Sequence, residues 1–363
     1  MRAAREAGGF SLARMAALTH FSKPYLGLVE TGRRAVTVEV IQRYEQALGV
    51  TIGTALDPVR VTHEWLIADS PAAIHLRAGR QVGADLVEAL EARTVQLRHL
   101  DDTVSSSHML PVITKELDAA TVLAREAVFG DAFGRRLFTV VGELAQLAGW
   151  VAGDAGQYLK AKQLYLSGVS ATETVGNRVL GAQLLSSLSY QIANVGRRED
   201  ALLIARSAVK GAVGATPVVR ALLLERHAWA AARLRDASTT RRVLNAVEDA
   251  YEQRSADICE PEWVYWLNRA EIDVMAARCA IELGTPAQAE PLLTRALAGY
   301  DSDHVREVAL YQTWLAESYA KTGDVDAARS TLDRAQTAAD RTDSARLQRR
   351  ITAVANLIDR RAA

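Results

Sequence analysis

The chain has 363 residues, enough for two or three domains with sizeable hydrophobic cores. Its 43 lysines and arginines balance 43 aspartates and glutamates, which excludes a protein that is basic overall, such as a histone-like coat for nucleic acid. Two cysteines are too few for a disulfide framework or a metal knuckle, and no run of 18 apolar residues predicts a membrane span. We therefore expect a soluble cytoplasmic protein without a cofactor.

The composition indicates an all-α fold. Hydrophobic residues make up 49% of the chain but aromatic residues only 6%, because alanine and leucine, both strong helix formers, dominate. Prolines are expected at helix boundaries, since the residue before a proline avoids the helical region; the positions concerned are Pro58, Pro71, Pro111, Pro217 and Pro261. We divide the chain into an N-terminal module (1–57), a helical connector (58–130) and a repeat region (131–363).

Residues 11–34 predict two short helices joined by a sharp turn, followed by a third helix over 37–50. Ser11 and Ser22 are N-cap candidates, and Pro24 falls just inside the second helix, where its missing N–H costs little. His20 occupies the turn, at a position that needs a positive φ. The side chains expected between the two helices are Met15, Phe21, Leu26 and Val29.

This segment resembles the helix-turn-helix of the phage repressor and Cro (XRE-like) family over about 50 residues. The resemblance implies a DNA-binding domain whose second short helix enters the major groove of double-stranded DNA. It also implies a structural salt bridge between Arg5 and Glu30. The first helix is about one turn shorter than the family's, so we expect the native start to lie upstream of Met1.

The residues expected to contact DNA are Ser22, Lys23, Pro24, Tyr25, Leu28, Arg33 and Arg34. Among the recognition positions only Lys23 can donate to a base edge, whereas the two arginines fit phosphate contacts, which position a protein without specifying sequence. The net charge of +2 over residues 1–57 is a weak electrostatic footprint. The alternative is a helix-turn-helix that persists only as a fold or as a dimer contact.

The connector contains a helix predicted from about Ala78 to Leu100, with Val82, Leu86, Leu90 and Leu97 near one face. This helix is a candidate for homodimerisation, and a plain connection between domains is an equal alternative.

The repeat region contains four segments in which a glycine precedes an alanine by five residues: Gly156 and Ala161, Gly196 and Ala201, Gly284 and Ala289, and Gly323 and Ala328. The glycine is expected to form a left-handed turn between two helices, and the small residues let those helices approach closely. A fifth copy, from Asp236, has Arg241 where alanine is expected. The segments resemble the tetratricopeptide repeat, although their spacing exceeds that family's 34 residues, and helical repeats of another type remain open.

An α-solenoid of such hairpins would line its concave face with the first helix of each hairpin. The residues that this register predicts for a groove are Glu143, Trp150, Gln183, Ser187, Tyr190, Asn194, His227, Arg278, Trp314 and Glu317, with Asp154, Glu271 and Lys321 in the same stripes. A groove of this kind is expected to hold a peptide, a small molecule or a protein partner. The alternative for each stripe is an ordinary solvated helix face.

The segment 259–273 concentrates Trp263, Tyr265 and Trp266, for which core packing is the favoured interpretation and stacking on a ligand the alternative. The sequence has no phosphate loop, no H-E-x-x-H, no G-x-S-x-G and no cysteine–histidine cluster, so we do not expect an enzyme.

Together, the two parts resemble actinobacterial transcriptional regulators that carry a helix-turn-helix and a repeat domain. The resemblance implies a DNA-binding, nucleoid-associated regulator whose body dimerises and senses an effector. The alternatives are a protein–protein interaction scaffold and an antitoxin-like repressor, in both of which the helix-turn-helix no longer reads DNA specifically.

Overall fold

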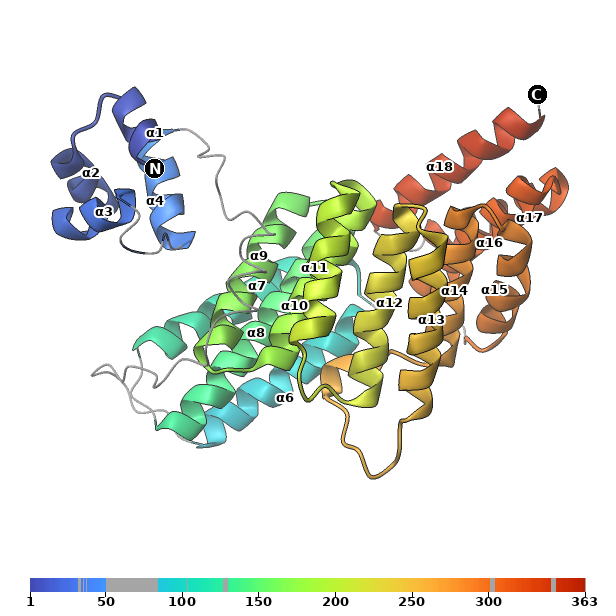
Figure 1. Cartoon of the computed structure of the whole chain (residues 1–363), viewed down its shortest axis with the longest axis horizontal. Helices are drawn as coiled ribbons and strands as arrows, with labels where there is room; N and C mark the ends of the chain where they lie inside the picture. The colour runs from blue at the N-terminus through green and yellow to red at the C-terminus, as the bar shows by residue number, and fades with distance from the viewer. Residues whose placement is uncertain are drawn as a thin grey trace. The chain divides into compact units, whose positions relative to one another are not determined.

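The computed structural model describes residues 1–31, 34, 36, 38–49, 84–102, 104–126, 130–300, 304–340 and 344–362, and every regular element in these ranges is a helix (Figure 1). The all-α prediction is thereby confirmed. The chain divides into two compact units, Met1–Val61 and Thr62–Ala363. The predicted boundary at residues 57 and 58 lies outside the described residues. Within the described ranges, no helix has the length and apolar character that crossing a membrane requires.

The first unit is a bundle of α1 (Arg2–Ala7), α2 (Leu12–Thr19), α3 (Lys23–Glu30) and α4 (Val38–Leu48). The Ser11 and Ser22 side chains cap α2 and α3 as predicted, accepting the backbone N–H of Arg14 at 3.1 Å and of Tyr25 at 3.3 Å. His20 takes the left-handed conformation between them, with φ of 60°. The buried core comprises Met15, Leu26, Val29, Val40 and Tyr44, whereas Phe21, expected to be buried, is only half-buried.

A buried ion pair ties α1 to the end of α3, as the family resemblance implied. Arg5 donates to both carboxylate oxygens of Glu30, at 2.7 and 2.8 Å, and the Tyr44 hydroxyl donates to the same carboxylate at 2.8 Å. Burial disfavours ionisation of Glu30, but the hydrogen bonds from Arg5 and Tyr44 outweigh it and hold its pKa below the usual range. The carboxylate therefore stays charged and links three of the four helices.

The second unit, which we call the body, begins with α6 and α7 and continues as five helical hairpins, α8–α9, α10–α11, α12–α13, α14–α15 and α16–α17 (Figure 1). The first helix of each hairpin contacts the first helix of the next, and the last helix, α18, packs on α16, α17 and α8. The bounds are α6 (Ala84–Asp101), α7 (Ser106–Glu126), α8 (Asp131–Asp154), α9 (Tyr158–Thr174), α10 (Arg178–Val195), α11 (Arg198–Gly211), α12 (Pro217–Arg233), α13 (Ala237–Glu252), η1 (Glu262–Val264), α14 (Arg269–Leu283), η2 (Pro286–Gln288), α15 (Ala289–Ala298), α16 (Val305–Thr322), α17 (Val325–Ala339) and α18 (Ala345–Ala362).

The turns inside the hairpins follow the predicted pattern in three copies, with φ of 80° at Gly156, 84° at Gly284 and 97° at Gly323. The prediction is wrong for Gly196, whose φ of −131° is extended backbone. In the remaining copy Arg235 takes the left-handed conformation, with φ of 59°. That copy therefore begins at Arg235, one residue earlier than predicted, and its small buried residue is Thr240 instead of the exposed Arg241.

Two predictions about the connector and the prolines are also corrected. Pro111 lies inside α7, as its sixth residue, instead of at its boundary, and it removes one backbone hydrogen bond from the second turn. On α6, Val87, Thr94 and Leu97 are buried, whereas Leu86 is 44% exposed, so the buried face is rotated from the predicted one. Pro217 begins α12 and Pro261 precedes η1, as expected, while Pro58, Pro71 and Val82 lie outside the described residues.

Close packing of α8 on α9 depends on a missing side chain at Gly149. A Cβ built there would lie 2.6 Å from the ring of Tyr165, which is fully buried. We expect Gly149→Ala to lower the free energy of unfolding of the body by about 2 kcal/mol, because a Cβ at this distance overlaps the ring and forces the ring or the helix to shift. Urea unfolding followed by tryptophan fluorescence reports on the body alone, since residues 1–61 contain no tryptophan.

Gly153→Ala on the same helix is the matched control. A Cβ at Gly153 meets nothing closer than 3.6 Å, so this substitution should be neutral or should stabilise by up to about 1 kcal/mol through helix propensity. Equal effects of the two substitutions would contradict the packing argument.

Candidate functional site

The candidate DNA-reading surface is the start of α3. Ser22, Lys23, Pro24 and Leu28 are exposed, and Leu28 presents 40% of its surface to solvent. Tyr25 is half-buried, with the Arg34 guanidinium 4.8 Å from its ring centroid. Arg33 lies outside the described residues. The Lys23 ammonium and the Arg34 guanidinium are therefore the described cationic groups beside the largely apolar exposed face of α3.

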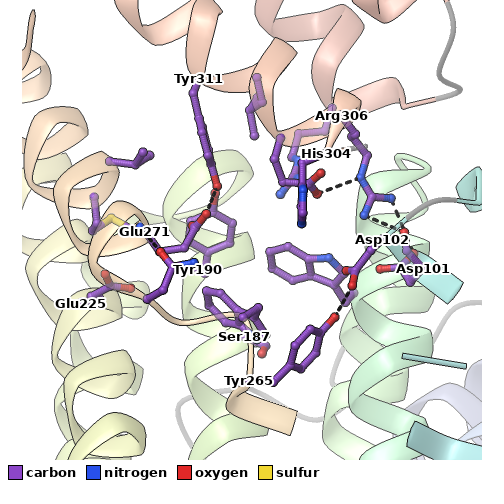
Figure 2. A pocket seen from close by; sticks show the side chains of 18 of the residues that line it. Asp101, Asp102, Ser187, Tyr190, Glu225, Tyr265, Glu271, His304, Arg306 and Tyr311 are labelled. Atoms are coloured by element: carbon purple, nitrogen blue, oxygen red, sulfur yellow. Dashed lines mark hydrogen bonds and ion pairs between the residues drawn. The ribbon is translucent and has the colours of Figure 1, made fainter. Parts of the chain in front are cut away.

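The candidate effector site is a pair of adjoining cavities in the body. The first, of about 300 Å³, is lined by α6, α8, α10, α12, α14, α16, α18 and the segment after η1 (Figure 2). The second, of about 370 Å³, is lined by α8, α9, α10, α12, α14, α16 and α18. Residues that line both cavities are Trp150, Ser187, Tyr190, Arg278, Leu310 and Arg346. These shared side chains make the two cavities neighbours in one site.

Seven of the ten predicted groove residues line these cavities. Trp150, Ser187, Tyr190 and Arg278 contribute to both, Gln183 lines the first, and Asn194 and Trp314 line the second. Spacings of three and four residues place such side chains on one stripe of a helix, and neighbouring first helices bring the stripes together. The structure thus gathers residues from four helices, α8, α10, α14 and α16, that the repeat register aligned.

Three predicted residues, Glu143, His227 and Glu317, are absent from the lining of both cavities. Glu143 and Glu317 instead hold arginines that do line them. Glu143 pairs with Arg98 at 3.6 Å, and Glu317 pairs with Arg350 at 2.5 Å. Both glutamates therefore support the cavity wall from behind.

The misplacement of His227 follows from the one-residue register error in its repeat. Ser187 and Trp314 each precede the turn residue of their copy by nine positions, and the residue nine positions before Arg235 is Arg226. Arg226 lines the first cavity, while His227 faces away from it. Burial, together with nearby arginines, lowers the pKa of His227 to about 4, so this imidazole is neutral at physiological pH.

Several lining residues were missed because they come from elements far apart in the sequence. The Arg306 guanidinium donates to the backbone oxygen of Asp101 at 2.8 Å, across 205 residues, and lies 3.6 Å from the Asp101 carboxylate (Figure 2). Arg346 of α18 pairs with Asp154 of α8 at 3.0 Å. These contacts join the beginning and the end of the body around the first cavity.

The aromatic segment after α13 divides between the two interpretations. Trp263 is buried and packs in the interior, as the favoured interpretation predicted. Tyr265 and Trp266 instead line the first cavity, where the Tyr265 hydroxyl donates to Asp102 (Figure 2). Only Trp263 therefore behaves as core, and the other two rings border open space.

Two buried arginines in the cavity walls have no carboxylate partner among the described residues. Arg226 is 6% exposed, and its guanidinium lies 4.3 Å from the ring centroid of Tyr190. Arg278 is 5% exposed and lies 4.4 Å from the Trp229 centroid and 4.8 Å from that of Trp314. Neither guanidinium forms an ion pair in the described part of the chain. Arg278 also hydrogen-bonds the Tyr190 hydroxyl, and Arg226 lies in the field of Glu225 and Glu271, so aromatic faces and these weaker contacts compensate the two positive charges.

The local electrostatic field is correspondingly positive at Tyr190. Burial by itself raises the pKa of its hydroxyl, but the charges of Arg278, Arg346 and Arg226 outweigh burial and lower that pKa to about 8. The neighbouring carboxyl group of Glu225 does not cancel this positive field, because it is mostly uncharged at neutral pH. Burial raises the pKa of this carboxyl group to about 8.

Two further carboxylates line the first cavity: Glu307, which pairs with Arg306, and Glu271. Glu271 accepts hydrogen bonds from the hydroxyls of Tyr300 and Tyr311 (Figure 2). Burial raises its pKa, against the effect of those two hydroxyls. Its Oε1 atom is therefore already engaged with two neutral donors.

Comparison with known proteins supports the assignment of the first unit. No curated protein matches the chain. A family model described as helix-turn-helix, of the XRE type, matches residues 1–54, and this family is one of DNA-binding regulators.

Proposed function

We propose that the chain is a DNA-binding transcriptional regulator whose body dimerises and senses an effector. The observation that carries the proposal is the helix-turn-helix match over residues 1–54, together with the solvent exposure of Ser22 and Lys23 at the start of α3. In this proposal α3 enters the major groove and Arg33 and Arg34 contact phosphates. Two such units in a dimer would address half-sites ~34 Å apart or a multiple of that distance.

Effector control would act through the body, whose cavities adjoin helices from α6 to α18. A molecule held there touches both ends of the helical array, so it binds differently to more open and more closed arrangements of the hairpins. Such differential affinity is what shifts a conformational equilibrium. The spacing between two DNA-reading units would then respond to occupancy.

A second candidate function is a scaffold, or an antitoxin-like repressor, that binds a protein partner without reading bases. The exposed apolar Pro24 and Leu28 favour it, because base edges are discriminated by bidentate donors and acceptors that these side chains lack. In that case charge on α3 would have no effect on occupancy of DNA.

Charge reversal at Lys23 and Arg34 distinguishes the regulator from the scaffold. We expect the double variant Lys23→Glu/Arg34→Glu to bind genomic fragments selected by the purified protein at least about 10-fold more weakly, with a shallower dependence on salt. Arg197→Glu/Arg241→Glu is the matched control, because it makes the same change in net charge at two exposed side chains of the other unit. The measurement is fragment selection with sequencing, followed by gel shift of the selected fragments.

The selection is run with and without cell extract, so that an effector required for binding is present in one arm. If neither arm enriches any fragment, the regulator proposal fails. If fragments are enriched but the double variant binds them as well as the control does, α3 is not the reading helix and the scaffold is favoured.

A further inference from the structure

We propose that the joined cavities of the body bind a small organic anion, a carboxylate or phosphate monoester on a flat apolar group, with its charge between Arg226 and Arg278. This inference rests on the proposed function, since it names the chemical class of the effector. It follows from charge, shape and closure of the site, which are independent of how the first unit treats DNA.

Among the described residues, the buried guanidiniums of Arg226 and Arg278 form no ion pair with a carboxylate. A buried cation is costly unless it is paired, and contact with an aromatic face returns only about 0.5–2 kcal/mol. Arg349 is exposed, and the remaining cavity arginines each pair with a carboxylate: Arg98, Arg233, Arg306, Arg346 and Arg350. The Nε of Arg278 is buried and has no hydrogen-bond acceptor within the described part of the chain. An anion in the cavity, next to both side chains, supplies the missing countercharge.

Aromatic side chains surround Arg226 and Arg278. Trp150 stacks on Tyr190 with centroids 5.9 Å apart, and Trp229 meets Trp314 edge to face at 5.8 Å. Trp150, Trp229 and Trp314 also line the second cavity, next to Arg278. Ligand pockets typically combine apolar walls with a few fixed polar groups, so a flat apolar moiety fits the second cavity while its anionic group faces Arg278.

The contacts between the first and the last helices of the body favour a small molecule over a peptide as the ligand. The α18 helix packs against α8 through Arg346 and Asp154, and Arg306 joins α16 to Asp101 at the end of α6. The helical array therefore ends on itself, whereas an extended peptide needs a groove that stays open at both ends. Each cavity, at about 300 and 370 Å³, lies at the lower end of the range for pockets that hold drug-sized ligands.

The competing interpretation is that Arg226 and Arg278 only pack between aromatic rings and hold the hairpins together. A purely structural role gives no preference for negative charge in a bound molecule. The two interpretations therefore differ in how the site treats ligands of equal shape and different charge.

The experiment uses the full chain and four naphthalene probes of nearly equal shape, titrated by isothermal calorimetry. The anionic probes are naphthalene-2-carboxylate and 2-naphthyl phosphate, the neutral probe is naphthalene-2-carboxamide, and the cationic probe is naphthalene-2-carboxamidine. We expect at least one anionic probe to bind saturably, the amide to bind at least about 10-fold more weakly, and the amidine not to bind. The better of the two anionic probes identifies the headgroup as carboxylate or phosphate.

Arg226→Gln and Arg278→Gln are each expected to weaken binding of the preferred anion by about 10-fold or more and to leave the affinity for the amide unchanged. Arg220→Gln, an exposed arginine on the same helix as Arg226, is the matched control and should change neither. If a glutamine variant does not fold, the ratio of carboxylate to amide affinity in the natural sequence decides alone.

Equal affinity for amide and anion, or no saturable binding of either anion, would overturn the inference. Because calorimetry does not involve DNA, such a result leaves fragment selection by the same protein intact, whereas loss of fragment selection with anion binding retained would overturn only the regulator proposal.

Discussion

Arg5→Ala is expected to destabilise the first unit by about 3–5 kcal/mol, because it leaves the buried carboxylate of Glu30 without its cation. The Arg5 and Glu30 side chains are only 11% and 4% exposed, and the Tyr44 hydroxyl alone cannot replace two charge-assisted hydrogen bonds. Since units of about 60 residues are marginally stable, a loss of this size unfolds much of the unit. Specific DNA binding should be lost with it.

Hydrogen exchange measured by mass spectrometry on peptides from α1 to α4 tests this expectation. Exchange in these peptides should accelerate by two orders of magnitude or more, while peptides from the body should be unchanged. Arg2→Ala is the matched control, because the Arg2–Glu6 pair is solvent-exposed and water screens such pairs, so its loss should leave exchange unchanged. Unchanged exchange in the Arg5 variant would mean that the ion pair does not hold the unit together.

Glu225→Gln is expected to stabilise the body at pH 8, by on the order of 3–5 kcal/mol, and to change its stability little at pH 5. Burial raises the pKa of Glu225 from 4.5 to about 8 in the folded state. Between these two values the folded chain holds a proton that the unfolded chain releases, so stability falls as the pH rises through this window. Glutamine copies the neutral acid and does not titrate, which removes the loss.

Urea unfolding of both proteins at pH 5, 6.5 and 8, followed by tryptophan fluorescence, measures this difference. Other groups of the body also titrate in the window, including Asp101, whose pKa burial raises to about 6, but their contributions are common to both proteins. The exposed Glu199→Gln is the matched control and should shift no midpoint. A stability difference that is the same at all three pH values would show that Glu225 is ionised in the folded protein.

Local patterns sufficed to predict much of this molecule. The caps at Ser11 and Ser22, the left-handed turn at His20 and the turns at Gly156, Gly284 and Gly323 depend on side chains within a few residues of each other. The stripe from Gln183 to Asn194 was also readable, because helical periodicity fixes which residues share a face. These features decided that the chain is all-α and which stripes face the cavities.

The sequence patterns were ambiguous at two places, and there the predicted register or buried face was wrong. Arginine at a left-handed position is unusual, so the copy beginning at Arg235 was aligned one residue late, and a one-residue shift rotates a helical position by about 100°. That shift alone exchanged Arg226 for His227 in the candidate site. The buried face of α6 was misjudged for a related reason, since its buried residues include the polar Thr94 and Arg98, which no hydrophobic pattern marks.

The sequence by itself determined the all-α fold, the caps of α2 and α3 and, except on α6 and α12, the cavity-facing stripes that were predicted, because these depend on interactions between residues three or four positions apart. Only the tertiary structure decided that α18 meets α8 and that Arg306 reaches Asp101, since these contacts depend on small rotations summed over five hairpins. The enclosed site, with Arg226 and Arg278 left without carboxylates, exists only once that closure is made. Interactions between residues close in sequence do not specify the total rotation over five hairpins, so they do not predict that the two ends of the body meet.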